Sequence, residues 1–216
     1  MGRTAVLFDL DGTLLDTLED IAAAVNRALV SLSLPPHPVE SYRTFVGEGI
    51  AVLARRVLPP DRHSDADAAA CLAAISREYG NGLLAKTKPY DGVVDLLREL
   101  VKRNIGIAIV SNKPHDLTVR SVETLFAGIP FGAVFGQRKG IAAKPDPTQA
   151  LAAARELRVA PGVCVYVGDS GIDMQTAVAA GMLPVGVLWG FRTREELLAN
   201  GAKAIVSRPA EILALL

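Results

Sequence analysis

The stretch Val6-Leu7-Phe8-Asp9-Leu10-Asp11-Gly12-Thr13, residues 6–13, decides how the rest of the chain is interpreted. It begins with three apolar residues, as a buried strand does, and the apolar run then ends in two aspartates separated by one leucine. Because side chains alternate along an extended chain, Asp9 and Asp11 would lie on one face and Leu10 on the other. The stretch therefore predicts a buried strand whose carboxyl end presents two carboxylates.

The composition describes a globular protein without a polyelectrolyte surface. Half of the 216 residues are hydrophobic, and 23 basic residues balance 23 acidic ones, so nucleic acid is not an expected partner. The apolar runs fall well short of the roughly 18 residues of a membrane span, and no signal peptide is recognised at the N-terminus. We expect a cytoplasmic protein, a monomer or a homodimer, that has no membrane partner.

Short β-branched runs alternate with segments of helical period, which predicts the α/β class. The expected architecture is a Rossmann-like parallel sheet core with helices on both faces. The predicted strands are 4–8, 105–110, 133–135, 163–167 and 184–188, with a short edge at 204–206. The predicted helices of this core are 92–103, 115–125, 147–157, 175–180, 193–200 and 210–215.

One interval breaks this rhythm, because roughly ninety residues separate the first two predicted strands, far more than one ordinary connection. Helical patterns fill it, the first with Thr17 as its N-cap and Pro35-Pro36 at its end, and further ones at 50–58 and 64–84. Residues 15–89 are therefore predicted to form an α-helical cap domain inserted after the first strand. Residues 1–14 and 90–216 would form the core, and the two connecting segments are natural hinges.

Polar residues follow four of the predicted strands, and ligands bind beyond the carboxyl ends of strands in open α/β sheets. These residues are Asp9, Asp11, Gly12 and Thr13; Ser111, Asn112 and Lys113; Lys144; and Gly168, Asp169, Ser170 and Asp173. Carboxylates at one rim repel one another unless a cation lies among them, and oxygen ligands favour Mg²⁺. Ser111 and Asn112, at an expected strand-to-helix turn, offer short side chains and N–H groups to phosphate oxygens, and Lys144 adds a positive charge.

Four motifs, in this order along the chain, resemble those of the haloacid dehalogenase superfamily. They are DLDGT at 9–13, SNK at 111–113, the lysine of KPDP at 144–147 and GDSGID at 168–173. The resemblance implies that Asp9 is the nucleophile that takes a phosphoryl group and that Asp11 is the acid and base. The residues expected to bind phosphate or substrate are Gly12, Thr13, Ser111, Asn112 and Lys144.

The same resemblance implies the metal ligands. Asp9, Asp169 and the backbone carbonyl of Asp11 would hold Mg²⁺, and Asp173 would support them. Each motif also has a purely structural alternative, since DLDGT could be a turn and GDSGID a capped helix start with Asp169 or Ser170 as the cap. All four at successive strand ends favour a site, because a site needs convergence and caps do not.

The inserted segment resembles the helical cap of the phosphoglycolate phosphatase and β-phosphoglucomutase branch, with residues 42–50 similar to the cap loop and 89–93 to the hinge. This implies a small phosphorylated metabolite as substrate, with 2-phosphoglycolate as the best single guess. Glu48 stands where many phosphoglycolate phosphatases have asparagine, and its carboxylate would repel that of glycolate. The candidates for cap specificity are Arg43, Gly47, Glu48, Gly49 and Arg55. A cation from Arg43, Arg55 or Arg56 could offset Glu48, or these side chains could form a solvated face.

Three functions remain open from the sequence. The favoured one is a Mg²⁺-dependent phosphatase that works through an aspartyl-phosphate. A β-phosphoglucomutase-like phosphomutase would use the same Asp9 and Asp11 but return the phosphoryl group to a sugar. The third is a non-catalytic phosphate-binding protein that keeps the fold, which the complete set of motif residues disfavours.

Overall fold

The core of the protein is a six-stranded parallel sheet in the order β5-β4-β1-β6-β7-β8. The computed structural model describes residues 2, 4–81 and 84–216. The strands are β1 (Ala5–Phe8), β4 (Gly106–Pro114), β5 (Ala133–Gln137), β6 (Cys164–Gly168), β7 (Leu183–Val187) and β8 (Ala204–Val206). The chain starts at the centre, moves outward to β5 and returns past β1 to β8, so the strand order reverses beside β1. This reversal is where a ligand site is expected in such a sheet.

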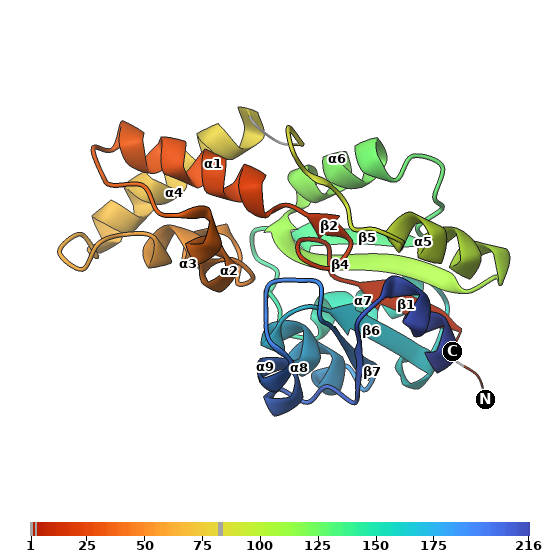
Figure 1. Ribbon diagram of the computed structural model, residues 1–216. Helices are drawn as coiled ribbons and strands as arrows, with labels where there is room; N and C mark the ends of the chain where they lie inside the picture. Colours follow the sequence, from red (N-terminus) through yellow and green to blue (C-terminus); the bar gives the residue numbers. More distant parts are fainter. Residues whose placement is uncertain (1, 3, 82–83) are drawn as a thin grey trace.

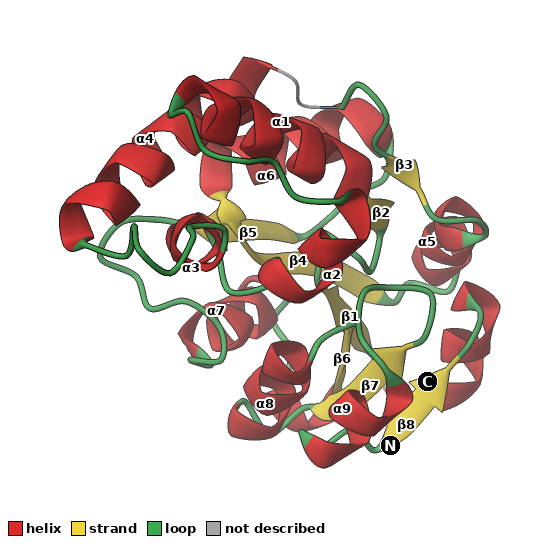
Figure 2. Cartoon of the chain, turned by 60° about the vertical axis from the view of Figure 1, so that its left-hand side comes forward, coloured by secondary structure: helices red, strands yellow, loops and turns green. Residues whose placement is uncertain are grey.

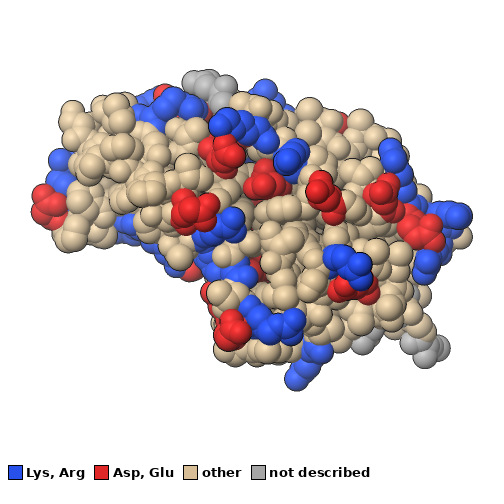
Figure 3. All heavy atoms as spheres, in the orientation of Figure 1, with Lys and Arg blue, Asp and Glu red and all other residues tan. Residues whose placement is uncertain are grey.

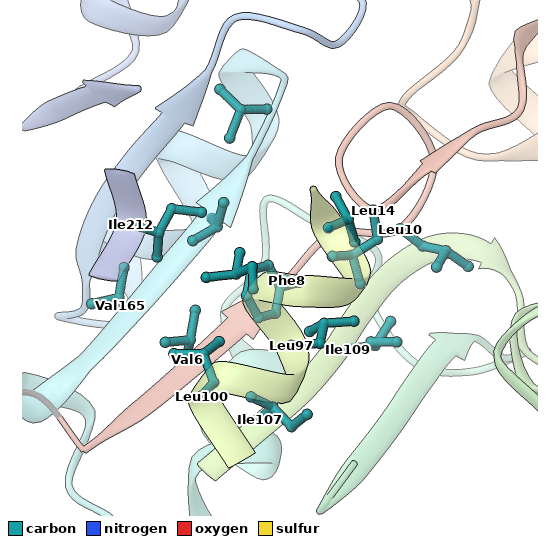
Figure 4. Close-up of a cluster of buried hydrophobic side chains, with 14 of the residues drawn as sticks. Val6, Phe8, Leu10, Leu14, Leu97, Leu100, Ile107, Ile109, Val165 and Ile212 are labelled. Carbon is teal, nitrogen blue, oxygen red and sulfur yellow. The ribbon is translucent and has the colours of Figure 1, made fainter. Parts of the chain in front are cut away.

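Helices cover both faces of the sheet, as predicted (Figure 2). One face holds α5 (Val93–Lys102), α6 (His115–Leu125) and the 3₁₀ helix Pro209–Leu215; the other holds α7 (Thr148–Glu156) and α8 (Gly171–Ala179), with α9 (Arg194–Ala199) beside α8 and β7. Alternation along β1 explains the two layers. Val6 and Phe8 pack against α5 (Figure 4), while Ala5 and Leu7 belong to the cluster that includes α7. Full burial of a side chain such as Phe8 contributes about 1.5–3 kcal/mol.

A second apolar cluster holds together the helices of residues 18–81, which lie beyond one end of the sheet (Figure 1). They are α1 (Leu18–Ser31), a 3₁₀ turn (Val39–Ser41), α2 (Tyr42–Phe45), α3 (Ile50–Arg56) and α4 (Asp65–Asn81). Two short strands, β2 (Leu15–Asp16) and β3 (Lys88–Pro89), pair antiparallel where the chain enters and leaves this layer. The division at residues 15 and 89 stays a prediction, and this packing is consistent with it.

The expected elements differ from the structure in several places. Ser111 and Asn112 were expected in a strand-to-helix turn, which is wrong: β4 continues through them and Lys113 to Pro114, with an irregular register after Val110. All three are buried, so the chain stays extended although its side chains become polar. The helix expected at 175–180 already starts at Gly171, and 210–215 is a 3₁₀ helix. The helix expected at 64–84 ends at Asn81, and its residues 82–83 lie outside the described part.

Thr17 occupies the N-cap position of α1, as expected, but its hydroxyl makes no capping hydrogen bond. The buried carboxylate of Asp20 instead ties the start of α1 to the returning chain, accepting hydrogen bonds from the backbone N–H groups of Lys86 and Thr87 and from the Thr87 hydroxyl. Both connections between core and cap are thereby joined to each other.

The surface carries interspersed charges of both signs on the face shown in Figure 3, in keeping with the balanced composition. Within the described residues, no helix has the length and apolar character that crossing a bilayer requires.

Candidate active site

The two aspartates of the opening stretch come just beyond the end of β1 and line one cavity, as their alternation predicts. The Asp9 N–H donates to the carbonyl of Val167 on β6 at 2.9 Å, so its backbone continues the sheet pattern. Leu10 points the other way and is fully buried in the apolar core. The anchored leucine therefore fixes the direction in which both carboxylates face.

Lys144 forms the positive centre of the site. Its ammonium lies 2.8 Å from Asp9 Oδ1 and 2.6 Å from Asp173 Oδ1, and its side chain is 2% exposed. Buried ion pairs of this kind need several partners to offset desolvation, and Lys144 has two carboxylates. Their charges, against the opposing effect of burial, keep the pKa of Lys144 well above its ordinary value. Lys144 therefore remains a cation next to Asp9.

Asp173 has a structural and a site role together. Ser170 caps α8, accepting from the Asp173 N–H, while the Asp173 carboxylate accepts from the Ser170 N–H at 3.1 Å and its hydroxyl at 2.6 Å. This reciprocal capping box fixes the carboxylate that Lys144 contacts. The capped-helix alternative for GDSGID is thus correct for Ser170, and it does not exclude a place in the site.

Asp169 comes directly after β6 and is held by the segments that follow β1 and β7. Its Oδ2 accepts from the Phe191 N–H at 2.7 Å, and the Thr13 hydroxyl lies 3.4 Å from Oδ1. Gly12 adopts φ +87°, and a Cβ there would lie 2.3 Å from Asp169 Oδ2. Gly12 is thus required both for the left-handed turn and for the close approach of Asp169.

Three buried carboxylates, those of Asp9, Asp169 and Asp173, bring oxygens within 4.8 Å of one another. Burial raises the pKa of Asp9 to about 7 and that of Asp169 to about 8, and repulsion from Asp173 adds to both. One ammonium, that of Lys144, faces this set. The excess of buried oxygen donors fits a hard cation such as Mg²⁺. The Asp11 carboxylate is not part of this group of three, and its Oδ1 lies 2.9 Å from the Lys113 ammonium.

Lys113, the last residue of the SNK motif, has partners that the sequence did not indicate. Its ammonium donates to Asp11 Oδ1 at 2.9 Å and to the Tyr79 hydroxyl of α4 at 2.7 Å. Burial opposes its charge, but Asp11 and Tyr79 raise the pKa of Lys113 above its ordinary value. Burial also raises the pKa of Tyr79 to about 12, so its hydroxyl keeps its proton at neutral pH. Lys113 thus joins Asp11 to Tyr79 of the cap.

Ser111 and Asn112 lie where the second motif meets the cavity, and both line it. The Asn112 carboxamide accepts from the Lys144 N–H at 2.9 Å and donates to the Gly47 carbonyl at 3.1 Å. Asn112 therefore connects the cap loop to the backbone of Lys144. The Ser111 hydroxyl accepts from the Lys113 N–H at 3.2 Å and is nearly inaccessible to solvent.

The cap closes over this site through its loop at 42–50. Arg43 donates to the Gly190 carbonyl at 3.1 Å, and Arg192 of the core donates to the carbonyls of Val46 at 2.8 Å and Thr44 at 3.3 Å. Arg192 was not anticipated, since nothing in its local sequence distinguishes it from a surface arginine. The cap is thus held shut in this structure by hydrogen bonds to backbone carbonyls.

The cavity beneath the cap has a volume of about 50 Å³. Its cap wall is aliphatic, built from Ile21, Val25, Val46, Ile50, Leu53 and Ile75 together with Gly47, Gly49 and Tyr79. Of the cap specificity candidates, only Gly47 and Gly49 line it. Arg55 pairs with Asp65 on the exposed surface, and Glu48 pairs with Arg56, so neither lies at the cavity among the described residues.

Comparison with known proteins agrees with the motifs. The model of the haloacid dehalogenase-like hydrolase family matches residues 6–187. A phosphoglycolate phosphatase of Pseudomonas putida is 36% identical over 205 residues, 93% of this chain and 75% of that protein. One of Neisseria meningitidis is 35% identical over 190 residues, 87% of this chain and 81% of that protein.

Solved structures show the same fold. A Lactobacillus delbrueckii protein provisionally named phosphoglycolate phosphatase superposes with a TM-score of 0.94 at 32% identity, over 100% of this chain and 99% of that one. A Bacteroides vulgatus protein provisionally named β-phosphoglucomutase has a TM-score of 0.78 at 20% identity, over 98% of this chain and 86% of that one, and so shares the fold alone. The chain belongs to the haloacid dehalogenase-like hydrolase family, and it is a phosphatase of that family.

Proposed function

We propose that this protein is a Mg²⁺-dependent phosphatase that hydrolyses a small phosphate monoester, 2-phosphoglycolate, through a phosphoryl group carried on Asp9. The observation that carries the proposal is that Asp9 and Asp11 line one cavity beneath the cap, with the buried ammonium of Lys144 2.8 Å from Asp9. The names of the curated relatives support the same substrate.

In the first chemical step, an Asp9 carboxylate oxygen forms a bond to phosphorus as the bond to the leaving oxygen breaks. Asp11 gives its proton to the leaving oxygen, producing the alcohol. In the second step Asp11, now a carboxylate, takes a proton from a water molecule as that water attacks phosphorus and releases Asp9. Splitting the hydrolysis in this way replaces one difficult displacement with two easier ones.

The surrounding residues prepare this chemistry. Lys144 lies next to Asp9, where its charge can stabilise the transferring oxygens, and Ser111 offers its hydroxyl from the cavity wall. Asp9 and Asp169 would hold Mg²⁺, with Asp173 behind them; the ion would supply charge neutralisation at the phosphoryl group. The closed cap excludes water and so strengthens these interactions.

The phosphomutase alternative needs polar groups that bind the hydroxyls of a sugar. The cap wall of the cavity is aliphatic apart from the Tyr79 hydroxyl and the backbone, so it offers a sugar few hydrogen-bond partners. A non-catalytic phosphate-binding role would use Lys144, but it would leave two carboxylates, those of Asp9 and Asp11, in a cavity where they repel the phosphate. Neither alternative has a specific observation in its favour.

The test is Mg²⁺-dependent phosphate release from 2-phosphoglycolate, glucose phosphates and p-nitrophenyl phosphate, with kcat/KM measured for each. We expect 2-phosphoglycolate to be preferred by about a hundredfold or more, which equals about 2.7 kcal/mol of transition-state discrimination. Asp9→Asn should lower every rate by at least about a thousandfold while the protein stays folded. A sugar phosphate preference would favour the mutase, and equal activity of parent and Asp9→Asn would reject the nucleophile.

A further inference from the structure

The cavity beneath the cap has one charged end that the assigned chemistry leaves unexplained. Among the described residues that line it, the charged ones are Asp9, Asp11 and Lys113, so Lys113 is its one cation. The wall that the cap contributes is aliphatic. Its hydrogen-bond donors for an oxygen anion are the Tyr79 hydroxyl and backbone N–H groups. An anionic group on a leaving group would therefore be attracted to this one corner of the cavity.

The cap arginines do not provide a second cation. In the described part of the chain, Arg43 is engaged with Glu40 and the Gly190 carbonyl, Arg55 with Asp65, and Arg56 with Glu48 and the Phe45 carbonyl. The side chain of Arg55 is more than half exposed. The explanation in which a cap arginine reads the substrate therefore has no support in this geometry.

Lys113 and Tyr79 each retain a donor. An ammonium has three N–H bonds, and those of Lys113 reach two partners within the described residues, Asp11 and Tyr79. The Tyr79 hydroxyl accepts from Lys113, and across residues 2, 4–81 and 84–216 its own O–H has no acceptor, so it can donate. Both side chains are nearly fully buried and both line the cavity, so both donors are shielded from bulk water.

We propose that Lys113 and Tyr79 form the subsite that recognises a carboxylate on the leaving group of the substrate. This inference rests on the proposed function, because it places the leaving group in the cavity beside Asp11. The carboxylate would accept one hydrogen bond from the Lys113 ammonium and one from the Tyr79 hydroxyl. An analogue without the carboxylate leaves both buried donors unpaired, so the subsite discriminates strongly against that analogue. Because Lys113 comes from the core and Tyr79 from the cap, the subsite is complete only with the cap closed.

The test compares two substrates that differ only at this group, 2-phosphoglycolate and ethyl phosphate, in the presence of Mg²⁺. The parent should prefer 2-phosphoglycolate by about a hundredfold or more in kcat/KM. Lys113→Met, which keeps an unbranched side chain, should reduce kcat/KM for 2-phosphoglycolate by about a hundredfold and for ethyl phosphate by less than about tenfold. Tyr79→Phe should lower the preference by about tenfold, with the larger change in KM. Lys102→Met, an exposed change on α5, is the matched control and should leave both substrates unaffected.

The outcomes separate this inference from the proposed function. If Lys113→Met slows both substrates equally, Lys113 acts only by positioning Asp11, and the subsite is rejected. A parent that hydrolyses both substrates equally well also rejects it, while leaving the phosphatase intact. If the parent releases phosphate from neither substrate nor from p-nitrophenyl phosphate, the proposed function itself fails. If thermal unfolding measurements show that Lys113→Met is not folded, Tyr79→Phe decides. An unchanged preference of Tyr79→Phe for 2-phosphoglycolate over ethyl phosphate then rejects the subsite.

Discussion

Single residues of this site are constrained by close approach as much as by chemistry. Gly12 stands where the chain turns after Asp11, and the Asp169 carboxylate occupies the space of the missing Cβ. A Cβ on Gly190 would likewise meet the Asp169 side chain, and also the Gly12 carbonyl. Asp169 is therefore positioned by two glycines as well as by the hydrogen bond from Phe191.

Replacement of Gly12 by alanine should consequently disable the site. The change adds a steric conflict with Asp169 to the strain of a left-handed alanine, which alone costs about 1–2 kcal/mol. We expect kcat to fall by about a hundredfold or more, since the carboxylate is displaced by the order of an ångström. Gly128→Ala is the control, because Gly128 has φ +82° with no atom within 4 Å of its added Cβ. It should lower the melting temperature without changing kcat; if both variants keep full activity, Asp169 is not needed where it lies.

At the scale of elements, the loop at 42–50 and the segment after β7 act on each other through backbone carbonyls. Arg192 reaches the carbonyls of Thr44 and Val46, and Asn112 reaches that of Gly47. Hydrogen bonds from a charged donor contribute about 1.5–3 kcal/mol each when both partners are well placed. The closed state therefore depends on a few contacts that a hinge motion can break together.

Arg192→Ala should shift the cap toward open conformations. We expect amide hydrogen exchange in residues 42–53 to accelerate by about tenfold, and KM to rise with little change in stability of the sheet, because about 1.5 kcal/mol of closure energy is lost. Arg194→Ala, an exposed neighbour on α9, should exchange as the parent does. Unchanged exchange in Arg192→Ala would mean that the cap is held by its apolar contacts instead.

Sequence patterns predicted the strands well and the contacts between distant segments poorly. The apolar runs of β1 and β6 stand out because both of their faces are buried. The positions of the strand ends placed Asp9, Lys144, Asp169 and Asp173 together. The contact of Lys113 with Tyr79 was not predictable, because it depends on how the cap closes. Two-residue strands such as β2 also carry no periodicity to detect.

For the whole molecule, the buried carboxylates couple folding, protonation and metal binding. The ordinary pKa of aspartate is about 4, whereas burial raises that of Asp9 to about 7 and that of Asp169 to about 8. Between about pH 4 and about pH 8, the folded protein without metal therefore holds more protons than the unfolded chain. Its free energy of unfolding decreases as pH rises through this window, since stability falls with pH where the native state binds more protons.

Mg²⁺ should reverse this trend, because a metal competes with protons for the same oxygens. In EDTA, we expect the melting temperature to decrease as pH rises from about 5 to about 8. The increase in melting temperature on adding Mg²⁺ should grow over the same range. Asp169→Asn should weaken both the pH slope and the Mg²⁺ effect. A Mg²⁺ effect that is constant with pH would contradict a site built from these carboxylates.

The central claim is that the phosphoryl group is transferred to Asp9 and that Asp11, acting as the base, then assists its hydrolysis. Mixing Asp11→Asn with p-nitrophenyl phosphate and Mg²⁺ tests it most directly, because this leaving group departs without an acid whereas the second step still needs a base. The account predicts a burst of one p-nitrophenol per protein, with phosphate found by peptide mass spectrometry on Asp9. A linear time course without a burst, or phosphate on any other residue, would contradict it.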